Sequence, residues 1–554
     1  MGFNLLTDPF LPVVLANGAR CWVAFHELAR EEGDEYPVEF DWPRADFNMA
    51  SYEFALGVLQ LALDIRKEQE WKDLWKQGAG DRGLSEKIAP FVAAFNLTGD
   101  GPLFLQDFEA LEGDANPIEA LLIDTPGQNG QKKNADLLTH RNRYAALGLP
   151  AAAMGLYALQ AYAPSGGAGN RTSMRGGGPL TALVLPAGGA MRPVALWRKL
   201  LANLVPQRTG LKAADRAKAL PWLAPTLTSD KASGNRQVHE ADTVHAHPLQ
   251  AYFGMPRRLR LVPSGQDGIC PMTGVMGPLV TGFIQRPYGV NYGLWRHPLT
   301  PYRRQSEAGD PYTAKPKSGH FGYRDWVAAT AGAREGLLAE PSSNVALARR
   351  TRAILLRTYA GGIDAQLRLG GWAMNNMEAI TYLFAEQPLH LAAHEAQCVA
   401  LDALAQRLAS AADDVASMLR AMLKQALFGD AKVSSDAGEL DLSRTRFYEA
   451  TENEFHAVLD DALGAMMPEG SLPEEQTLAR TWLTAMRRAA LNVFDEIAPV
   501  PLEDAERARR IVGAYGQLSA ILAGGGKKAG EALFEKLQLP RPERKDGKKK
   551  ETAG

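Results

Sequence analysis

The sequence predicts an α+β protein, in which a large mixed α/β domain at residues 1–385 precedes a C-terminal four-helix bundle at residues 386–525. Up to about residue 385, strand-like runs alternate with long loops and with turns rich in glycine and proline. Beyond it, apolar residues recur at the i, i+3, i+4, i+7 spacing of amphipathic helices. Short connections between such helices are typical of an antiparallel bundle.

The N-terminal domain begins with a predicted hairpin and a buried helix. Leu11–Leu15 and Arg20–Phe25 flank an Asn-Gly pair, which is a strong hairpin signal. Phe47–Ile65 carries apolar residues on most of its faces, so we expect a buried helix. Further short helices are predicted at Trp71–Trp75 and Leu84–Phe95, and further strands at Leu180–Leu185, Arg258–Val262 and Leu279–Ile284.

The C-terminal domain contains four predicted helices. They span His390–Phe428, Leu442–Met467, Ser471–Ile497 and Asp504–Leu522. Gly429 is expected to end the first helix, and Ser471 with Glu474 has the spacing of a capping box. Residues 526–554 are predicted to form a basic, disordered tail, because Arg541–Lys550 is rich in lysine and arginine and lacks apolar residues.

Composition limits the function classes. The net charge of −2 over 554 residues argues against a protein that coats nucleic acid unspecifically, although it allows a local basic face. Three widely spaced cysteines and no Cys-x-x-Cys pair fit a reducing cytoplasm. We expect no signal peptide and no bilayer-spanning segment.

The sequence contains no motif of a nucleotide-binding or hydrolytic enzyme, so we predict neither catalytic residues nor a cofactor. His239, His245 and His247 share one polar loop, but loop histidines without a nearby cysteine are mostly unliganded, and no metal site is predicted.

Two loops point to nucleic acid. Pro164–Pro179 has six glycines, two arginines and no acidic residue, a composition that suits close contact with phosphates or a narrow groove, or else a flexible linker. Gly370–Glu378 combines a glycine pair with two asparagines and two methionines. Asparagine amides can bind base edges and methionine can wedge between bases, although a turn into a following helix would have the same composition.

An ordered set of segments resembles the large-subunit (CasA) family of the type I-E CRISPR surveillance complex, Cascade. The segments are Asn4–Val13, Pro126–Gln128, Ser165–Pro179, Tyr252–Leu261, Thr281–Phe283, Gly293–Pro298 and Gly370–Glu378, followed by the helical bundle. No single motif decides the resemblance, but the order extends over nearly the whole chain.

The resemblance implies a non-enzymatic protein that recognises the protospacer-adjacent motif (PAM) of foreign double-stranded DNA and promotes strand separation and R-loop formation. The implied partners are the guide CRISPR RNA, other Cascade subunits and a separate helicase–nuclease, with no membrane partner. The guide RNA reads the remaining sequence by base pairing.

The family's functional loops correspond to three groups of residues here. The implied PAM-binding residues are Gly166, Gly167, Gly169, Asn170, Arg171, Arg286, Asn375, Asn376 and Met377. Arg171 and Arg175 are expected to hold phosphates. The implied contacts to RNA or to neighbouring subunits are Leu122, Asp124 and Gln128.

The chain departs from the family pattern at two places. Some members bind zinc through cysteine pairs, but only Cys270 is present in that area, so we predict no zinc. Met377 replaces a frequent glutamine in the wedge, which leaves the PAM preference open. A scaffold subunit whose glycine loop contacts only guide RNA or sister subunits remains the alternative.

Overall fold

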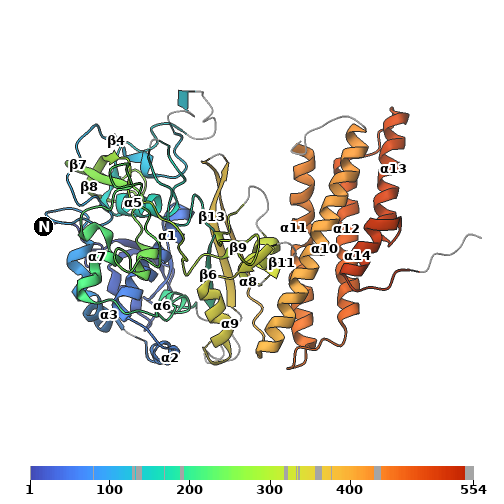
Figure 1. The fold of residues 1–554 in the computed structure, drawn as a ribbon, viewed down its shortest axis with the longest axis horizontal. Coiled ribbons are helices and arrows are strands. Elements are labelled where there is room, and N and C mark those ends of the chain that lie inside the picture. Colours follow the sequence, from blue (N-terminus) through green and yellow to red (C-terminus); the bar gives the residue numbers. More distant parts are fainter. Residues whose placement is uncertain are drawn as a thin grey trace, which may run out of the picture. The chain divides into compact units, whose positions relative to one another are not determined.

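The computed structural model describes residues 2–542 apart from residues 79, 128–130, 133–139, 168, 187–192, 317–321, 332, 335–336, 356–364, 376 and 430–437. Small sheets and short helices occupy the N-terminal part of the chain, and long helices the C-terminal part (Figure 1). The predicted α+β fold class is therefore confirmed. Contacts divide the chain into unit 1, within residues 1–321, 328–332 and 336–391, and unit 2, within residues 322–327, 333–335 and 392–554.

Unit 1 contains small antiparallel sheets. The strands of the first two sheets are, in spatial order, β2 (Arg20–Val23), β1 (Leu11–Leu15) and β3 (Pro37–Phe40), and then β14 (Glu378–Pro388), β13 (Ala365–Asn375) and β6 (Thr181–Pro186). A third sheet contains β10 (Tyr312–Thr313), β9 (Tyr302–Arg304) and β12 (Leu337–Glu340) in this order. In a fourth sheet the order is β4 (Asn116–Pro117), β8 (Met276–Arg286) and β5 (Leu147–Gly148), and β7 (Arg258–Ile269) also pairs with β8. The predicted N-terminal hairpin and the strands β6, β7 and β8 are confirmed. The sequence reading missed the hairpin of β13 and β14.

Unit 1 contains one long buried helix, α1, against which α3, α5 and α6 pack. The α-helices that the structure describes in this unit are α1 (Ala45–Leu63), α2 (Glu68–Gln77), α3 (Gly80–Ile88), α5 (Leu149–Tyr162), α6 (Leu196–Leu201), α7 (Arg216–Ala219) and α9 (Ser343–Leu355). Phe54 in α1 is fully buried, and the rings of Phe10, Phe25 and Phe104 meet it edge to face with centroid separations of 5.4, 6.1 and 5.7 Å. This aromatic cluster confirms the expectation that α1 is buried and gives unit 1 its core.

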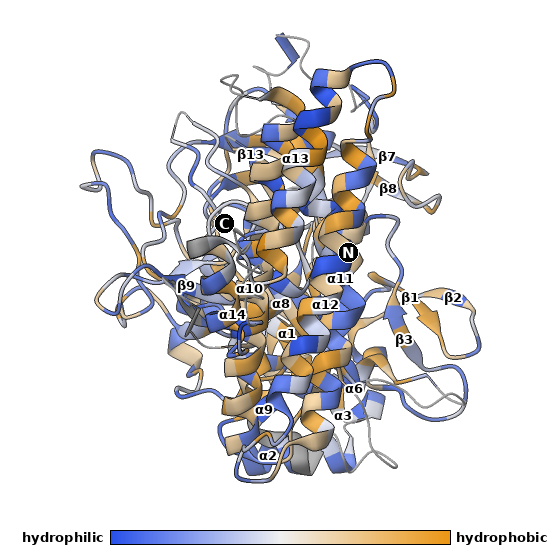
Figure 2. Cartoon of the chain, turned by 90° about the vertical axis from the view of Figure 1, so that its right-hand side faces the viewer, coloured by the Kyte–Doolittle hydropathy of each residue, from blue (hydrophilic) through white to orange (hydrophobic). Residues whose placement is uncertain are grey.

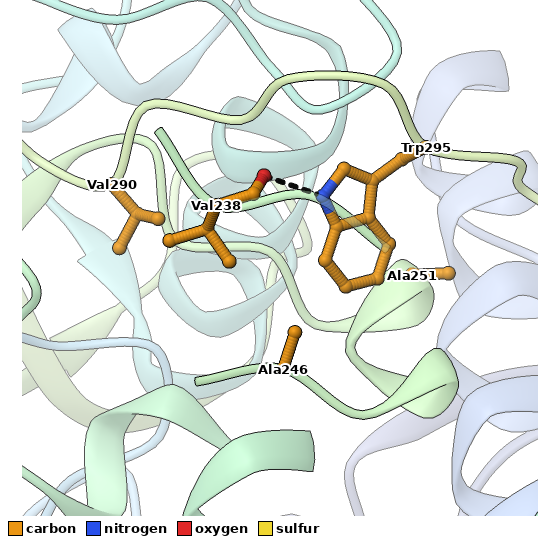
Figure 3. Close-up of a cluster of buried hydrophobic side chains, with 5 residues drawn as sticks. All are labelled: Val238, Ala246, Ala251, Val290 and Trp295. Atoms are coloured by element: carbon orange, nitrogen blue, oxygen red, sulfur yellow. Dashed lines mark hydrogen bonds between the residues drawn. The ribbon is translucent and has the colours of Figure 1, made fainter. Parts of the chain in front are cut away.

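A smaller apolar cluster fixes the segments that follow β8. It consists of Val238, Ala246, Ala251, Val290 and Trp295 (Figure 3). The indole Nε1 of Trp295 donates a hydrogen bond to the carbonyl of Val238 over 2.8 Å, so the buried ring leaves no polar atom unpaired.

Unit 2 is the predicted helical bundle. Its long helices are α10 (Glu395–Phe428), α11 (Gly438–Ala465), α12 (Glu475–Ile497) and α13 (Ala505–Leu522). Hydrophilic and hydrophobic residues alternate along α11, α12 and α13 in Figure 2, as expected of helices with one buried face. Gly429 ends α10 with a φ of +57°, as predicted. The predicted Ser471 cap is wrong, because Ser471 Oγ donates to Glu469 and α12 begins only at Glu475.

A short stretch that precedes the bundle in sequence also belongs to unit 2. Tyr323, the first residue of α8 (Tyr323–Thr330), stacks on Phe455 with a centroid separation of 4.4 Å and an interplanar angle of 16°. Trp326 meets the same ring edge-on. These rings complete the apolar core of the bundle.

The prediction that residues 526–554 are disordered is wrong for the part that the structure describes. Gly526–Gly530 forms a π-helical turn and Glu531–Lys536 forms α14. Leu533 and Phe534 are buried, and Lys536 Nζ lies 2.6 Å from the carboxylate of Asp414 on α10. The described part of this segment has four buried apolar residues, Leu533, Phe534, Leu537 and Leu539, which are too few to produce a strong helical periodicity in the sequence.

Within the described residues, every helix is too short or too polar to cross a lipid bilayer.

Candidate nucleic-acid interface

The first half of the glycine loop is a tight turn. Gly166 N donates to Asn170 O, and Asn170 N donates to Gly167 O over 2.7 Å. Gly167 and Gly169 have φ values of +65° and +82°, which residues with a side chain rarely adopt. At Gly169 a Cβ would also lie 2.7 Å from the ring of Tyr288, so only glycine fits without a shift.

This turn is joined directly to the end of β8. The amide Nε2 of Gln285 donates to Asn170 Oδ1 over 2.6 Å, and Tyr288 N donates to Gly169 O over 2.8 Å. Arg286 lies between these two anchors, is exposed, and forms no ion pair with any described residue. The structure therefore brings together two of the elements that the sequence singled out, the glycine turn and Arg286.

Arg171 is held in place beside the same turn. Its Nε donates to Ser229 Oγ over 2.8 Å and its Nη2 donates to Ser229 O over 2.7 Å. Its guanidinium carbon lies 5.8 Å from the ring centroid of Tyr288. Among the residues that the structure describes, no carboxylate pairs with Arg171, so its positive charge remains available to an anion.

Arg175 has a structural role, so the expectation that it holds a phosphate is wrong. Its side chain is 3% exposed and its Nη2 lies 2.6 Å from Glu53 Oε2 on α1. Its Nη1 donates to Thr181 and Thr300. Burial opposes the charged guanidinium, but Glu53 outweighs it and the pKa of Arg175 is raised.

The second predicted loop is the tip of the β13–β14 hairpin. Asn375 and Glu378 are paired at the ends of the two strands and are both exposed. Met377 has a φ of +70° and is 60% exposed. The alternative of a turn into a helix is wrong, because the chain continues as a strand on both sides. Asn376 lies outside the described residues.

The glycine loop also contacts this hairpin. Gly178 has a φ of +59°, and a Cβ there would lie 2.1 Å from the carbonyl oxygen of Trp372 in β13. One loop thus touches the end of β8 at Gly169 and Asn170, and β13 at Gly178.

The segment predicted to contact RNA or sister subunits is more tightly packed than expected. Leu122 is 2% exposed and its side chain belongs to the core, so the predicted contact stays a prediction for its backbone alone. Asp124 forms ion pairs of 2.9 Å with both Arg44 and Arg143. Burial raises the pKa of Asp124, but these arginines outweigh it and hold the pKa below its usual value. Gln128 lies outside the described residues.

Sequence reasoning missed two residues that shape this candidate interface. Ser229 and Tyr288 position Arg171 and the glycine turn, yet neither stands in a recognisable motif. In the part of the chain that the structure describes, no three His, Cys, Asp or Glu side chains cluster as metal ligands would.

Comparison with known proteins decides the family. Residues 4–493 match the family model of the CRISPR-associated protein Cse1. This chain is a member of the Cse1 family.

Solved Cse1 structures share its fold. The structure of Thermus thermophilus CasA (Cse1) is 19% identical, with a TM-score of 0.67 over 94% of this chain and all of that chain. Thermobifida fusca Cse1 is 17% identical, with a TM-score of 0.66 over 97% of this chain and 98% of that one. A chain of a structure described as a CRISPR RNA-guided surveillance complex is 17% identical, with a TM-score of 0.64 over 94% of this chain and 99% of that one.

Proposed function

We propose that this Cse1 chain is the large subunit of a type I-E CRISPR RNA-guided surveillance complex, and that it recognises the PAM of double-stranded DNA without catalysing a reaction. In this proposal its partners are the guide CRISPR RNA, the other Cascade subunits and target DNA. It acts in the cytoplasm, promotes local strand separation and helps to recruit a helicase–nuclease.

One observation carries the proposal: the glycine turn is fastened to the end of β8 beside Arg286, which is exposed and forms no ion pair with any residue that the structure describes. A turn without side chains at Gly167 and Gly169 allows the backbone to approach a narrow minor groove. Arg171 and Arg286 supply positive charge to the flanking phosphates. Because the minor groove distinguishes mainly A·T from G·C pairs, such a reader should tolerate several PAM sequences.

The exposed tip of the β13–β14 hairpin supports the step of strand separation. Met377 presents a flexible apolar side chain that is 60% exposed on a rigid two-stranded support. Apolar side chains of this kind can insert between base steps and unstack them. Asn375 at the same tip can bond to a base edge.

The test compares DNA binding with DNA opening in the reconstituted complex. We expect Met377→Ala to lower the permanganate reactivity of PAM-proximal thymines about tenfold when the same fraction of the DNA is bound. A tenfold change corresponds to a loss of about 1.4 kcal/mol from the free energy with which the protein stabilises the unstacked bases. Gel-shift affinity should change little. The matched control is Met467→Ala, which truncates a 48% exposed methionine of unit 2. Equal losses in both assays would contradict the wedge, and binding that ignores the PAM would favour a scaffold subunit.

A further inference from the structure

We infer that an open groove beside the second half of the glycine loop binds one unpaired nucleotide of single-stranded DNA. The groove has a volume of about 680 Å³. It is lined by parts of Met174–Gly176, Gly293–Trp295, Tyr302–Arg303 and Pro311–Lys315. The choice of DNA rests on the proposed function, whereas the choice of a nucleotide rests on the chemistry of the groove.

The groove is positively charged and has no acidic lining residue. Arg303 and Lys315 form no ion pair within the described part of the chain. The register of β9 and β12 explains this for Arg303. Glu340 lies opposite Tyr302 and pairs with Arg304, which shares its face of the sheet. Alternation along β9 turns Arg303 to the other face, away from that carboxylate.

Lys315 approaches the glycine loop itself. A Cβ at Gly176 would lie 3.0 Å from its Nζ, so the ammonium group stands directly over the loop backbone. Partial burial lowers the pKa of Lys315, and no carboxylate in the described part of the chain pairs with it to offset the lost hydration. A bound phosphate would supply that missing partner.

An aromatic side chain stands next to the cations. Tyr312 is 43% exposed and lies directly opposite Arg303 in the antiparallel pair of β9 and β10. Side chains at such positions share a face and have Cβ atoms about 5 Å apart. A base stacked on Tyr312 therefore places its own phosphate within reach of Arg303, the arrangement by which single strands are commonly bound.

The back of the groove is rigid. Trp295 is buried in the apolar cluster of Figure 3, where its indole donates to Val238 O. Tyr302 Oη donates to Trp295 O over 3.0 Å. Leu294 adds a 41% exposed apolar side chain at the rim. The groove is thus shaped before any ligand arrives, which reduces the entropy lost on binding.

The position of the groove favours DNA over RNA as its ligand. Its wall, Met174–Gly176, continues from the turn that we propose to contact the PAM duplex. A duplex that opens at this turn exposes unpaired nucleotides next to Lys315 and Tyr312.

The experiment measures binding of fluorescein-labelled oligo(dT) to the full chain by fluorescence anisotropy over a series of salt concentrations. We expect Tyr312→Ala to weaken binding roughly tenfold, and Tyr312→Phe by less than about twofold because the stacking face is kept. Arg303→Ala and Lys315→Ala should each lower the salt slope by about 0.7. The matched control is Arg82→Ala, which removes an arginine that is 94% exposed on α3.

Affinity for oligo(dT) that stays within about twofold in all of these variants would overturn the inference. A larger effect of the same variants on oligo(rU) would make the groove an RNA site and would also overturn it. A closed PAM duplex serves as a separate probe: its binding should depend on Arg171 and not on Tyr312. If the unmodified chain binds duplexes with and without a PAM equally well, the proposed function is contradicted. Binding of oligo(dT) tests the groove independently of that result.

Discussion

Two arginines of the glycine loop are expected to respond in opposite ways to substitution. Arg175 is paired with Glu53 inside unit 1, whereas Arg171 is held beside the turn without a carboxylate partner. Arg175→Met should therefore reduce stability and leave DNA contacts intact. Arg171→Ala should weaken DNA binding and cost less stability.

The size of the stability effect follows from the bonds around Glu53. Its carboxylate accepts hydrogen bonds of 3.1 and 2.6 Å from Arg175 and one of 2.6 Å from Thr181. Arg175→Met leaves only the bond from Thr181 to a fully buried charge. Loss of one partner of a buried pair costs about 3–5 kcal/mol. The double variant Glu53→Gln, Arg175→Met removes both charges. Its free energy of unfolding should therefore be at least about 2 kcal/mol higher than that of Arg175→Met alone.

Urea unfolding followed by tryptophan fluorescence measures the stability of each variant, and salt-dependent anisotropy on duplex DNA measures phosphate contacts. Arg171→Ala should lower the slope of log K against log salt concentration by about 0.9, the contribution of one phosphate. Arg175→Met should leave this slope unchanged under conditions in which the protein is folded. A reduced slope for Arg175→Met with normal stability would refute the reasoning.

Three further predictions concern other parts of the chain. Gly169→Ala should weaken DNA binding more than Gly167→Ala in gel shifts, because both have a positive φ but only the Cβ at residue 169 would meet a ring, at 2.7 Å; equal losses would contradict this. Burial raises the pKa of Glu39, but Arg368 outweighs it and the pKa falls to about 2 from an ordinary 4.5. Its contribution to the free energy of unfolding, about 3 kcal/mol, is therefore complete above pH 4.5 and lost as the pH falls towards 2, so Glu39→Gln should flatten the acid side of the pH–stability profile measured by thermal melting. Phe534→Ala should destabilise unit 2 by about 3–5 kcal/mol in urea, whereas a disordered segment would show no change.

The sequence predicted the parts of the fold in which pattern and packing agree. The apolar faces of Phe47–Ile65 and the four bundle helices reflect local periodicity, and all appear in the structure. The β13–β14 hairpin was missed because its strand contains Gly370 and Gly371, which weaken any strand pattern. These glycines are required by close packing: a Cβ at Gly371 would lie 2.7 Å from Pro179 O.

The loops of the candidate interface could be predicted from the sequence, but the partners of their charged side chains could not. The glycine turn, Arg286 and the exposed Met377 stood out by composition and by resemblance to a family. Nothing local to Arg175 distinguished it from Arg171, because its partner Glu53 lies on α1, 122 residues away in sequence. The choice between a phosphate-binding and a structural arginine therefore depended on tertiary contacts.

The most direct test of PAM recognition is selection from a DNA library with randomised bases beside the target sequence, bound by the reconstituted complex and sequenced. The proposal predicts that the unmodified complex enriches a small set of related sequences. Arg286→Ala and Gly169→Ala should flatten that enrichment, while Arg82→Ala should leave it unchanged. Equal recovery of all sequences by the unmodified complex, or enrichment that survives both substitutions, would contradict it.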